Sequence, residues 1–213
     1  MSQLEKIFPQ PDQRVMILGA TGSGKTEYAI WMLEKIVGRI QIDILDTKYE
    51  PKFERLPMHE VVENFSLLDK CTAPVRIYRP TAQELLDQEL LDAYLQWRYE
   101  NAPDLTYIDE LNSLGITAKP RPGLLNLLTR GRSRESALWM GSQRPAWVSR
   151  FAFSEASKFF VFYLNDEDDR ARVVKFTTKE LMQSPRYDYG FWYYRVGSKS
   201  AVQYKPIKLK GVS

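Results

Sequence analysis

A glycine-rich stretch near the N-terminus has the residue types and the spacing that bind phosphate. It runs Gly-Ala-Thr-Gly-Ser-Gly-Lys-Thr from Gly19 to Thr26, and it fits the phosphate-loop pattern G-x-x-x-x-G-K-[ST] without a mismatch. Glycines allow positive φ, so that successive backbone N–H groups can converge on one anion. The plain alternative is a glycine-rich turn before an ordinary helix. We predict a nucleotide-binding loop made of Gly19, Ala20, Thr21, Gly22, Ser23, Gly24, Lys25, Thr26 and Glu27.

Two side chains of this loop have separate tasks. Lys25 would reach the β- and γ-phosphates as a point charge, and the Thr26 hydroxyl would coordinate Mg²⁺. The helix that begins near Lys25 adds the positive end of its dipole at the same place. A short, largely apolar run at 14–18 precedes the loop, and apolar residues at helical spacing follow it. This context predicts ATP as the substrate and Mg²⁺ as the cofactor.

A pair of acidic residues, Asp109 and Glu110, ends another apolar run farther along the chain. Phosphate hydrolysis needs a carboxylate that holds Mg²⁺ through its water shell and a base that activates the attacking water. Adjacent residues of a strand point to opposite sides, so at the strand end Asp109 can face the metal while Glu110 turns toward the γ-phosphate. Two acids in a strand-to-loop turn are the plain alternative. We predict a catalytic role for both.

A third group of polar residues surrounds the strand predicted at 137–142. If this strand lies between those that carry the loop and the acid pair, Gln143 would point at the γ-phosphate and sense which nucleotide is bound. Arg130, Arg132 and Arg134 precede the strand. A charge run is usually a solvated face, but phosphoryl transfer often uses an arginine from a neighbouring subunit.

The elements that must position these side chains alternate between strands and helices. A Pro-Thr-x-x-Glu capping box at 80–84 opens one helix, and a second box is expected at 177–180. Residues 49–72 are weakly patterned and are expected to be a surface connection with a short helix near 59–69. The predicted strands are 14–18, 40–45, 75–78, 104–110, 137–142 and 159–164; the predicted helices are 26–37, 81–99 and 124–129, with a loop at 112–123.

This alternation predicts an α/β fold, with a mostly parallel sheet and helices on both faces. Residues 190–196 and 201–207 would form a C-terminal antiparallel β-hairpin. At 213 residues we expect a single domain over 1–213, with its core at about 14–175 and a short helix and the hairpin at 176–213.

Composition excludes several classes of protein. The net charge is only +3, so a nucleic-acid surface must be local. The single cysteine, Cys71, rules out an internal disulfide, and the single histidine, His59, argues against a zinc site or a histidine-based triad. We find no run of about 18 apolar residues and no signal-peptide pattern, so we expect no transmembrane helix.

Taken together, these residues resemble the FtsK–HerA superfamily of P-loop ATPases. The resemblance rests on Gly19–Thr26, on Asp-Thr-Lys at 46–48, on Asp109-Glu110, and on the run from Gly131-Arg132 through Ser-Gln-Arg-Pro at 142–145. It covers about residues 14–175 and implies a RecA-like fold of the additional-strand type. By resemblance Gln143 is the sensor, and Arg132, with Arg130 second, is the arginine that acts on a neighbouring subunit.

In its size, the chain most resembles the genome-packaging ATPases of tailless, internal-membrane double-stranded DNA viruses. That resemblance implies a homo-oligomeric ring, pentameric or hexameric, which moves double-stranded DNA without reading its sequence. A capsid or membrane protein at a packaging vertex would be a further partner. The location would be the host cytoplasm or a virion vertex. The candidate DNA contacts are Lys119, Arg121, Arg144 and Arg150, with Lys199, Lys205, Lys208 and Lys210 as a basic tail.

Several other functions remain open from the sequence. One is an ATPase of the same superfamily that drives filamentous-phage assembly, secretion or conjugation, although such proteins usually carry a membrane segment. Another is a P-loop switch or a small-molecule kinase, in which the 112–123 loop would act as a lid. A third is a nucleotide-binding subunit without turnover, in which alanine at Glu110 would change nothing.

Overall fold

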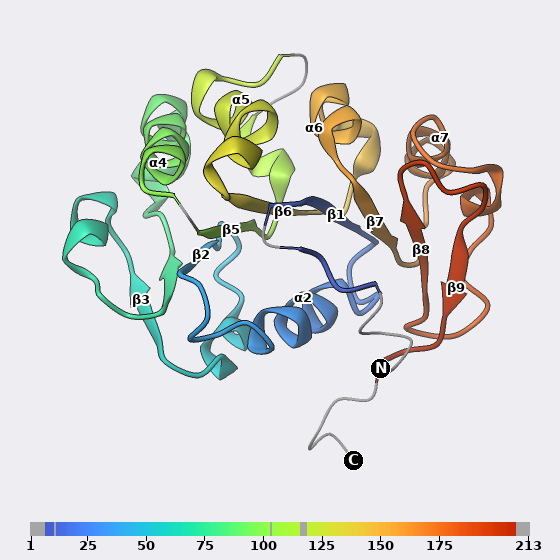
Figure 1. The fold of residues 1–213 in the computed structure, drawn as a ribbon, viewed down its shortest axis with the longest axis horizontal. Coiled ribbons are helices and arrows are strands. Elements are labelled where there is room, and N and C mark those ends of the chain that lie inside the picture. The colour runs from blue at the N-terminus through green and yellow to red at the C-terminus, as the bar shows by residue number, and fades with distance from the viewer. Residues whose placement is uncertain (1–6, 11, 103, 116–118, 208–213) are drawn as a thin grey trace.

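One nine-stranded sheet organises the part of the chain that the computed structural model describes, residues 7–10, 12–102, 104–115 and 119–207. Its strand order is β3-β4-β2-β5-β6-β1-β7-β8-β9. Strands β1 to β7 are parallel, and β8 and β9 join one edge as an antiparallel hairpin (Figure 1). The strands are β1 Arg14–Leu18, β2 Ile42–Leu45, β3 His59–Val62, β4 Val75–Tyr78, β5 Leu105–Ile108, β6 Ala137–Ser142, β7 Lys158–Val161, β8 Phe191–Arg195 and β9 Val202–Tyr204.

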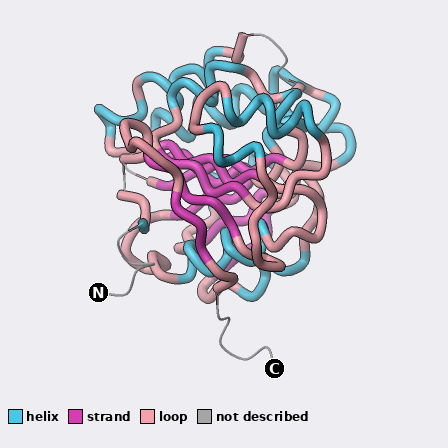
Figure 2. The backbone as a smooth tube through the Cα atoms, turned by 90° about the vertical axis from the view of Figure 1, so that its right-hand side faces the viewer, coloured by secondary structure: helices cyan, strands magenta, loops and turns pink. Residues whose placement is uncertain are grey.

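Helices cover both faces of the sheet. Helix α2 (Lys25–Glu34) lies on one face, and α4 (Gln88–Glu100), α5 (Pro122–Thr129) and α6 (Arg150–Glu155) lie on the other (Figure 1). Seen from the side, the strands run between the two layers (Figure 2). The remaining α-helices are α3 (Ala82–Leu86) and α7 (Glu167–Val174); 3₁₀ turns occupy Pro51–Arg55, Phe65–Lys70, Leu111–Leu114, Gly131–Arg134, Pro145–Trp147 and Lys179–Met182.

The core consists of two layers because alternate residues of each strand point to opposite faces. In β1, Val15 and Ile17 join the cluster under α2, whereas Met16 and Leu18 join the cluster under α4, α5 and α6. Strands β1, β2 and β4 to β7 are buried along their whole length, as expected of parallel strands covered on both faces. These strands therefore hold their carboxyl ends, and the residues that follow, in fixed positions.

The expected alternation and the terminal hairpin are confirmed, but some elements differ. The helix expected near 59–69 is wrong: His59–Val62 forms an additional parallel strand, β3, beside β4, and a 3₁₀ turn follows it. The helix expected at 81–99 is two helices, because the Asp87 side chain accepts hydrogen bonds from the backbone of Glu89 and Leu90 and starts α4 anew.

The two expected capping boxes have different outcomes. The box at Thr81 and Glu84 is present in both directions. The box expected at 177–180 is absent from the described structure: a short 3₁₀ turn begins after Thr178 with no side-chain cap. Helices α6 and α7 were not expected from the sequence at all. Both are short, and tertiary contacts rather than a long apolar period decide whether such helices form.

Strand β6 lies between β5 and β1, which is the arrangement that the Gln143 hypothesis required. In the register, Leu18 of β1 is opposite Ser142 of β6, and Ile108 of β5 is opposite Met140. The phosphate loop, the acid pair and Gln143 therefore leave three neighbouring strands at one edge of the sheet. Ligands bind at this edge in open α/β sheets.

Candidate nucleotide-binding site

The phosphate loop is seated across the ends of its two neighbouring strands. The Gly19 N–H donates to the Ser142 carbonyl at 3.1 Å, and the Ala20 N–H donates to the Tyr163 carbonyl at 2.8 Å. Gly24 has φ 95°, which side chains disfavour, and its carbonyl starts α2 by accepting from the Tyr28 N–H. The loop thus passes directly into a helix, and a helix N-terminus is suited to binding an anion.

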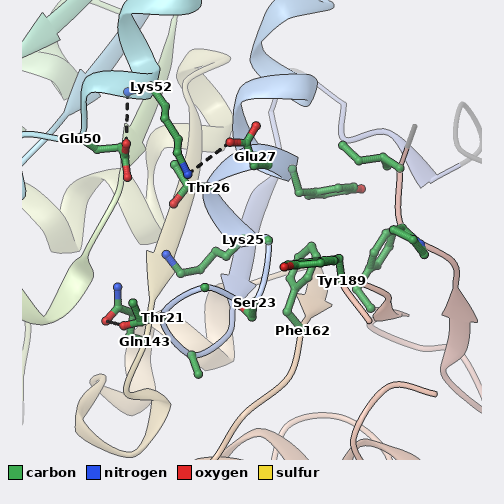
Figure 3. Close-up of a pocket in the computed structure, with 17 residues that line it drawn as sticks. Thr21, Ser23, Lys25, Thr26, Glu27, Glu50, Lys52, Gln143, Phe162 and Tyr189 are labelled. Carbon is green, nitrogen blue, oxygen red and sulfur yellow. Dashed lines mark hydrogen bonds and ion pairs between the residues drawn. The ribbon is translucent and has the colours of Figure 1, made fainter. Parts of the chain in front are cut away.

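Lys25 is buried, with 4% of its surface exposed. Burial lowers the pKa of its ammonium group, while the carboxylates of Asp109 and Glu110 act in the opposite direction. Its side chain extends toward Thr21 and Gln143 (Figure 3). Because a buried cation needs a negative partner, the position fits a phosphate group.

Asp109 and Glu110 follow β5 and are both buried. The Tyr107 hydroxyl donates to Asp109 Oδ1 at 3.0 Å. Burial, together with the neighbouring Asp109 carboxylate, raises the pKa of the Tyr107 phenol well above its usual range, so the phenol stays protonated and keeps donating. The Asp109 carboxylate is thereby fixed at the end of its strand.

Lys48 contacts Glu110, which the sequence did not predict. Its Nζ lies 2.5 Å from Glu110 Oε2, and the Gln143 backbone N–H lies 3.3 Å from both carboxylate oxygens. The Asp-Thr-Lys stretch after β2 is part of the resemblance described above, but the pattern of a single strand does not indicate a partner that follows another strand. The Glu110 carboxylate is therefore held by groups that follow two other strands.

The Gln143 side chain lies beside the phosphate loop. The Thr21 hydroxyl donates to Gln143 Oε1 at 2.8 Å (Figure 3). Gln143 thus touches the loop with its side chain and Glu110 with its backbone. This placement joins the residues that the sequence assigned to phosphate binding and to hydrolysis.

The available oxygen atoms fit Mg²⁺ held largely by phosphates and water. Thr26 lines the pocket beside the loop, and Asp109 supplies a buried carboxylate at the end of β5, on the other side of β6. The described residues contain no group of three or more His, Cys, Asp or Glu that could hold a metal ion by themselves. Mg²⁺ commonly keeps several waters and uses one or two protein oxygens plus substrate phosphates, so a small donor set is suitable.

The pocket beside the loop has a volume of about 700 Å³ and an apolar end that the sequence did not predict. Glu50, Lys52 and Gln143 line it at one side, and Phe162 and Tyr189 lie at the opposite end (Figure 3). The rings of Tyr28 and Phe191 pack against Phe162 at that end, and the pocket lining also includes Pro206 and Ile207. The residues of this end come from α2, from the chain after β7 and from the hairpin region. Only their spatial convergence makes them a site, which a single sequence does not reveal.

Glu27 follows the loop and belongs to a small surface ion-pair group. Its carboxylate lies 2.7 Å from Arg55 and 3.3 Å from Lys52. Partial burial alone would raise the pKa of Glu27, but Arg55 and Lys52 outweigh it and lower the pKa. Glu27 lines the pocket, so the residue remains at the predicted site while its charge is already paired.

The predicted arginines lie apart from this pocket. Arg130 and Arg132 are exposed in the turn before β6; the Arg132 guanidinium is paired with Asp12 at 3.2 Å while its side chain stays 80% exposed. Neither lines the pocket in the described chain. This location is compatible with an arginine that acts on another subunit, and that role stays a prediction.

The candidate DNA contacts differ in their exposure to solvent and in whether their charge is already paired. Lys119, Arg121 and Arg150 are exposed. Arg144 is paired with Asp166 at 3.1 Å and with Asp169 at 2.9 Å, and its guanidinium lies over the Trp147 ring. Lys208 and Lys210 of the basic tail lie outside the described residues.

Within the described chain, no helix has the length and apolar character needed to cross a membrane. No family model matches the sequence. The chain is 32% identical, over 94% of its length and 89% of the relative, to the DNA packaging ATPase P9 of Enterobacteria phage PRD1.

The fold has counterparts among solved structures. The genome packaging NTPase B204 from Sulfolobus turreted icosahedral virus 2, in complex with ATP-gammaS, matches with a TM-score of 0.74 at 18% identity, covering 94% of this chain and all of that chain. The pCW3 conjugation coupling protein TcpA matches with a TM-score of 0.61 at 14% identity, covering 91% of this chain and 59% of that chain. Both matches concern the fold.

Proposed function

Because the chain belongs to the family of viral DNA packaging ATPases within the FtsK–HerA group, we propose that it hydrolyses ATP to move double-stranded DNA into a viral capsid. The observation that carries this proposal is the identity of 32% to a DNA packaging ATPase over 94% of the chain. The geometry of the phosphate loop, the acid pair and Gln143 supports it independently, because these groups meet at one edge of the sheet.

Binding of the triphosphate falls to the phosphate loop. The loop N–H groups and the dipole of α2 would hold the phosphates, and the buried Lys25 ammonium would balance their charge. Thr26 and Asp109 would hold Mg²⁺ together with phosphate oxygens and water. The chemistry that Mg²⁺ would supply there is neutralisation of the negative charge that develops on the phosphates.

Hydrolysis falls to the residues at the neighbouring strand ends. Glu110 would accept a proton from the attacking water, and Lys48 and the Gln143 N–H hold its carboxylate in one orientation. The Gln143 side chain, which already contacts Thr21 of the loop, would hydrogen-bond the γ-phosphate or the water. A neutral amide suits this task because it can both donate and accept.

The remaining parts of the motor would come from assembly. We place this chain in a homo-oligomeric ring, with the exposed Arg132, and Arg130 second, reaching the nucleotide of a neighbouring subunit. Sequence-independent grip on DNA would use exposed cations such as Lys119, Arg121 and Arg150. A capsid or membrane protein at a packaging vertex would recruit the ring.

The experiment that tests the site assignment is the replacement Lys25→Ala. We expect it to abolish steady-state ATP hydrolysis, because the buried cation that meets the phosphates is lost. Lys35→Ala, at an exposed position just beyond the same helix, is the matched control and should hydrolyse ATP normally. Normal turnover by the Lys25→Ala variant would contradict the assignment of the phosphate loop as the ATP-binding site.

A further inference from the structure

The nucleotide pocket has two chemically different ends on opposite sides of the phosphate loop. One end carries the polar side chains of Thr21, Gln143 and Lys52. The other end is apolar and aromatic, and Tyr189 and Phe162 lie there (Figure 3). A nucleotide is similarly divided into a charged triphosphate and an aromatic base, so the two ends of the pocket set the direction in which it can bind.

The direction follows from Lys25. Its side chain extends from the loop toward Thr21 and Gln143, away from Tyr189 (Figure 3). The terminal phosphate that meets this ammonium must therefore lie at the polar end, near the strand ends that carry Glu110 and Gln143. The nucleoside then extends from the loop toward the aromatic end.

We propose that the nucleobase stacks on the ring of Tyr189 at the aromatic end of the pocket, and that this platform selects bases by stacking area rather than by hydrogen bonding. The proposal rests on the nucleotide-binding function proposed above and assigns the base subsite within it. It predicts that adenine and guanine nucleotides bind with similar affinity and that pyrimidine nucleotides bind more weakly.

The backbone around Tyr189 holds the residue at this position. Tyr189 is 64% exposed, whereas the neighbouring Phe162 and Phe191 are buried. The φ of Tyr189 is 55°, a left-handed conformation that a non-glycine residue adopts only where the structure imposes it. The next residue, Gly190, donates its N–H to the Tyr187 carbonyl, and a Cβ there would lie 2.8 Å from the Tyr204 carbonyl. The turn is thus fixed against β9.

The platform adjoins the phosphate loop and has a rigid base. A Cβ on Gly24 would lie 3.4 Å from Tyr189 Cδ1, so the ring lies against the loop itself. Beneath it the buried rings of Phe162 and Phe191 have centroids 5.2 Å apart, and Phe191 stacks on Tyr204 at 5.4 Å. A nucleobase placed on Tyr189 would therefore lie next to a cluster of buried aromatic rings.

Weak discrimination between bases follows from the chemistry of this end. Among its described lining residues, the polar side-chain groups are the hydroxyls of Tyr189 and of Tyr28, whose ring packs against the apolar rings of Phe162 and Phe191. A hydroxyl can donate or accept, so it can pair with an amino group or with a carbonyl of a base. Strong rejection of a wrong base requires buried polar groups that are left unpaired by it. Stacking accepts every base because each has a π-face, and a purine covers more of the platform than a pyrimidine.

The test is equilibrium binding of ADP, GDP, CDP and pyrophosphate, measured by calorimetry on the full chain. Tyr189→Ala should weaken ADP and GDP by about tenfold, because stacking on an aromatic residue is lost, and should leave pyrophosphate unchanged. Tyr189→Phe, which keeps the ring, should bind like wild type. Tyr187→Ala, a partly exposed tyrosine of the same turn that does not line the pocket, is the matched control.

The wild-type chain should bind ADP and GDP within about threefold of each other and CDP more weakly. A loss of pyrophosphate binding equal to that of ADP in Tyr189→Ala would overturn the proposal, since Tyr189 would then act on the loop. Unchanged ADP binding, or strong exclusion of GDP by wild type, would overturn it too. Lys25→Ala should lose all four ligands. If wild type bound none of them, the proposed function would fail together with the base platform.

Discussion

At the scale of single residues, the site is a balance of buried charges. Lys25, Asp109 and Glu110 are all nearly inaccessible to solvent, and Lys48 contacts Glu110 from a different strand. An isolated buried charge is costly, so each of these groups depends on the others and on the ligand. A substitution that removes one charge but keeps the shape of the side chain should therefore show whether that charge serves ATP binding or hydrolysis.

Glu110→Gln separates binding from hydrolysis. The amide keeps the shape of the side chain but cannot accept a proton, so turnover should fall by a factor on the order of 100 or more while ATP binding is retained. Single-turnover hydrolysis and calorimetric binding measure the two quantities. Glu89→Gln, at an exposed position on α4, should change neither. Equal loss of binding and hydrolysis would instead indicate a metal-binding or folding role for Glu110.

The sequence predicted the residues that are contiguous in the chain and missed those that meet only in space. Lys25 and Thr26 are read from one loop because its pattern is local. The contact between Lys48 and Glu110 joins the ends of β2 and β5, and the Tyr189 platform joins the hairpin region to the loop. No periodicity in one sequence records such pairings. The roles of the predicted site residues themselves remain predictions.

At the scale of elements, the order of the strands builds the site. Strand β6 is inserted between β5 and β1, so that Gln143 reaches both the loop and Glu110. The residues of β6 were predicted from the sequence, but the place of this strand in the sheet was only a condition of the Gln143 hypothesis. Strand β3 was missed because its exposed residues do not form an apolar run: Glu60 is exposed, and only Val62 of the strand is buried.

Lys158 in β7 fastens the N-terminal segment and should make stability depend on pH. Its buried Nζ donates to the carbonyls of Ile7 and Phe8, at 3.2 and 2.8 Å. Burial lowers its pKa to about 8. The folded pKa is thus below the unfolded one, so between about pH 8 and pH 10 the unfolded chain binds more protons and stability should rise with pH, by on the order of 2 kcal/mol.

Denaturant unfolding of wild type and Lys158→Met from pH 7 to pH 10 measures this effect. The difference between the two free energies of unfolding isolates Lys158 from the tyrosines, which begin to ionise at the alkaline end. We expect the difference to shift in favour of wild type as pH rises above 8. Parallel curves would mean that Lys158 has the same pKa in the folded and unfolded chain.

At the scale of the whole molecule, one exposed turn lies outside the subunit's own pocket. The 3₁₀ turn Gly131–Arg134 precedes β6 and presents Arg132 to solvent, held lightly by Asp12. An exposed ion pair is worth little, so Arg132 could exchange Asp12 for a phosphate group of a neighbouring subunit at small cost. One chain supplies only one side of such an interface. The predicted role of Arg132 must therefore be tested in the assembled ring.

Mixed rings test whether Arg132 acts across that interface. Arg132→Ala subunits mixed with wild type should lower ATP hydrolysis by more than their fraction, because each one would disable a wild-type neighbour. Arg134→Ala, in the same turn but hydrogen-bonded to the Glu100 carbonyl, is the matched control. A loss strictly proportional to the fraction of Arg132→Ala subunits would place the arginine's action within its own subunit or exclude it.

The central claim, that this chain is a DNA-translocating ATPase, is tested most directly by steady-state ATP hydrolysis with and without double-stranded DNA. The assay is run at low and high salt beside a sizing measurement. The account predicts hydrolysis that DNA stimulates in a ring-sized species, and stimulation that falls as salt rises, because the contacts are to phosphates. Hydrolysis by a monomer that is indifferent to DNA at every salt concentration would contradict the account.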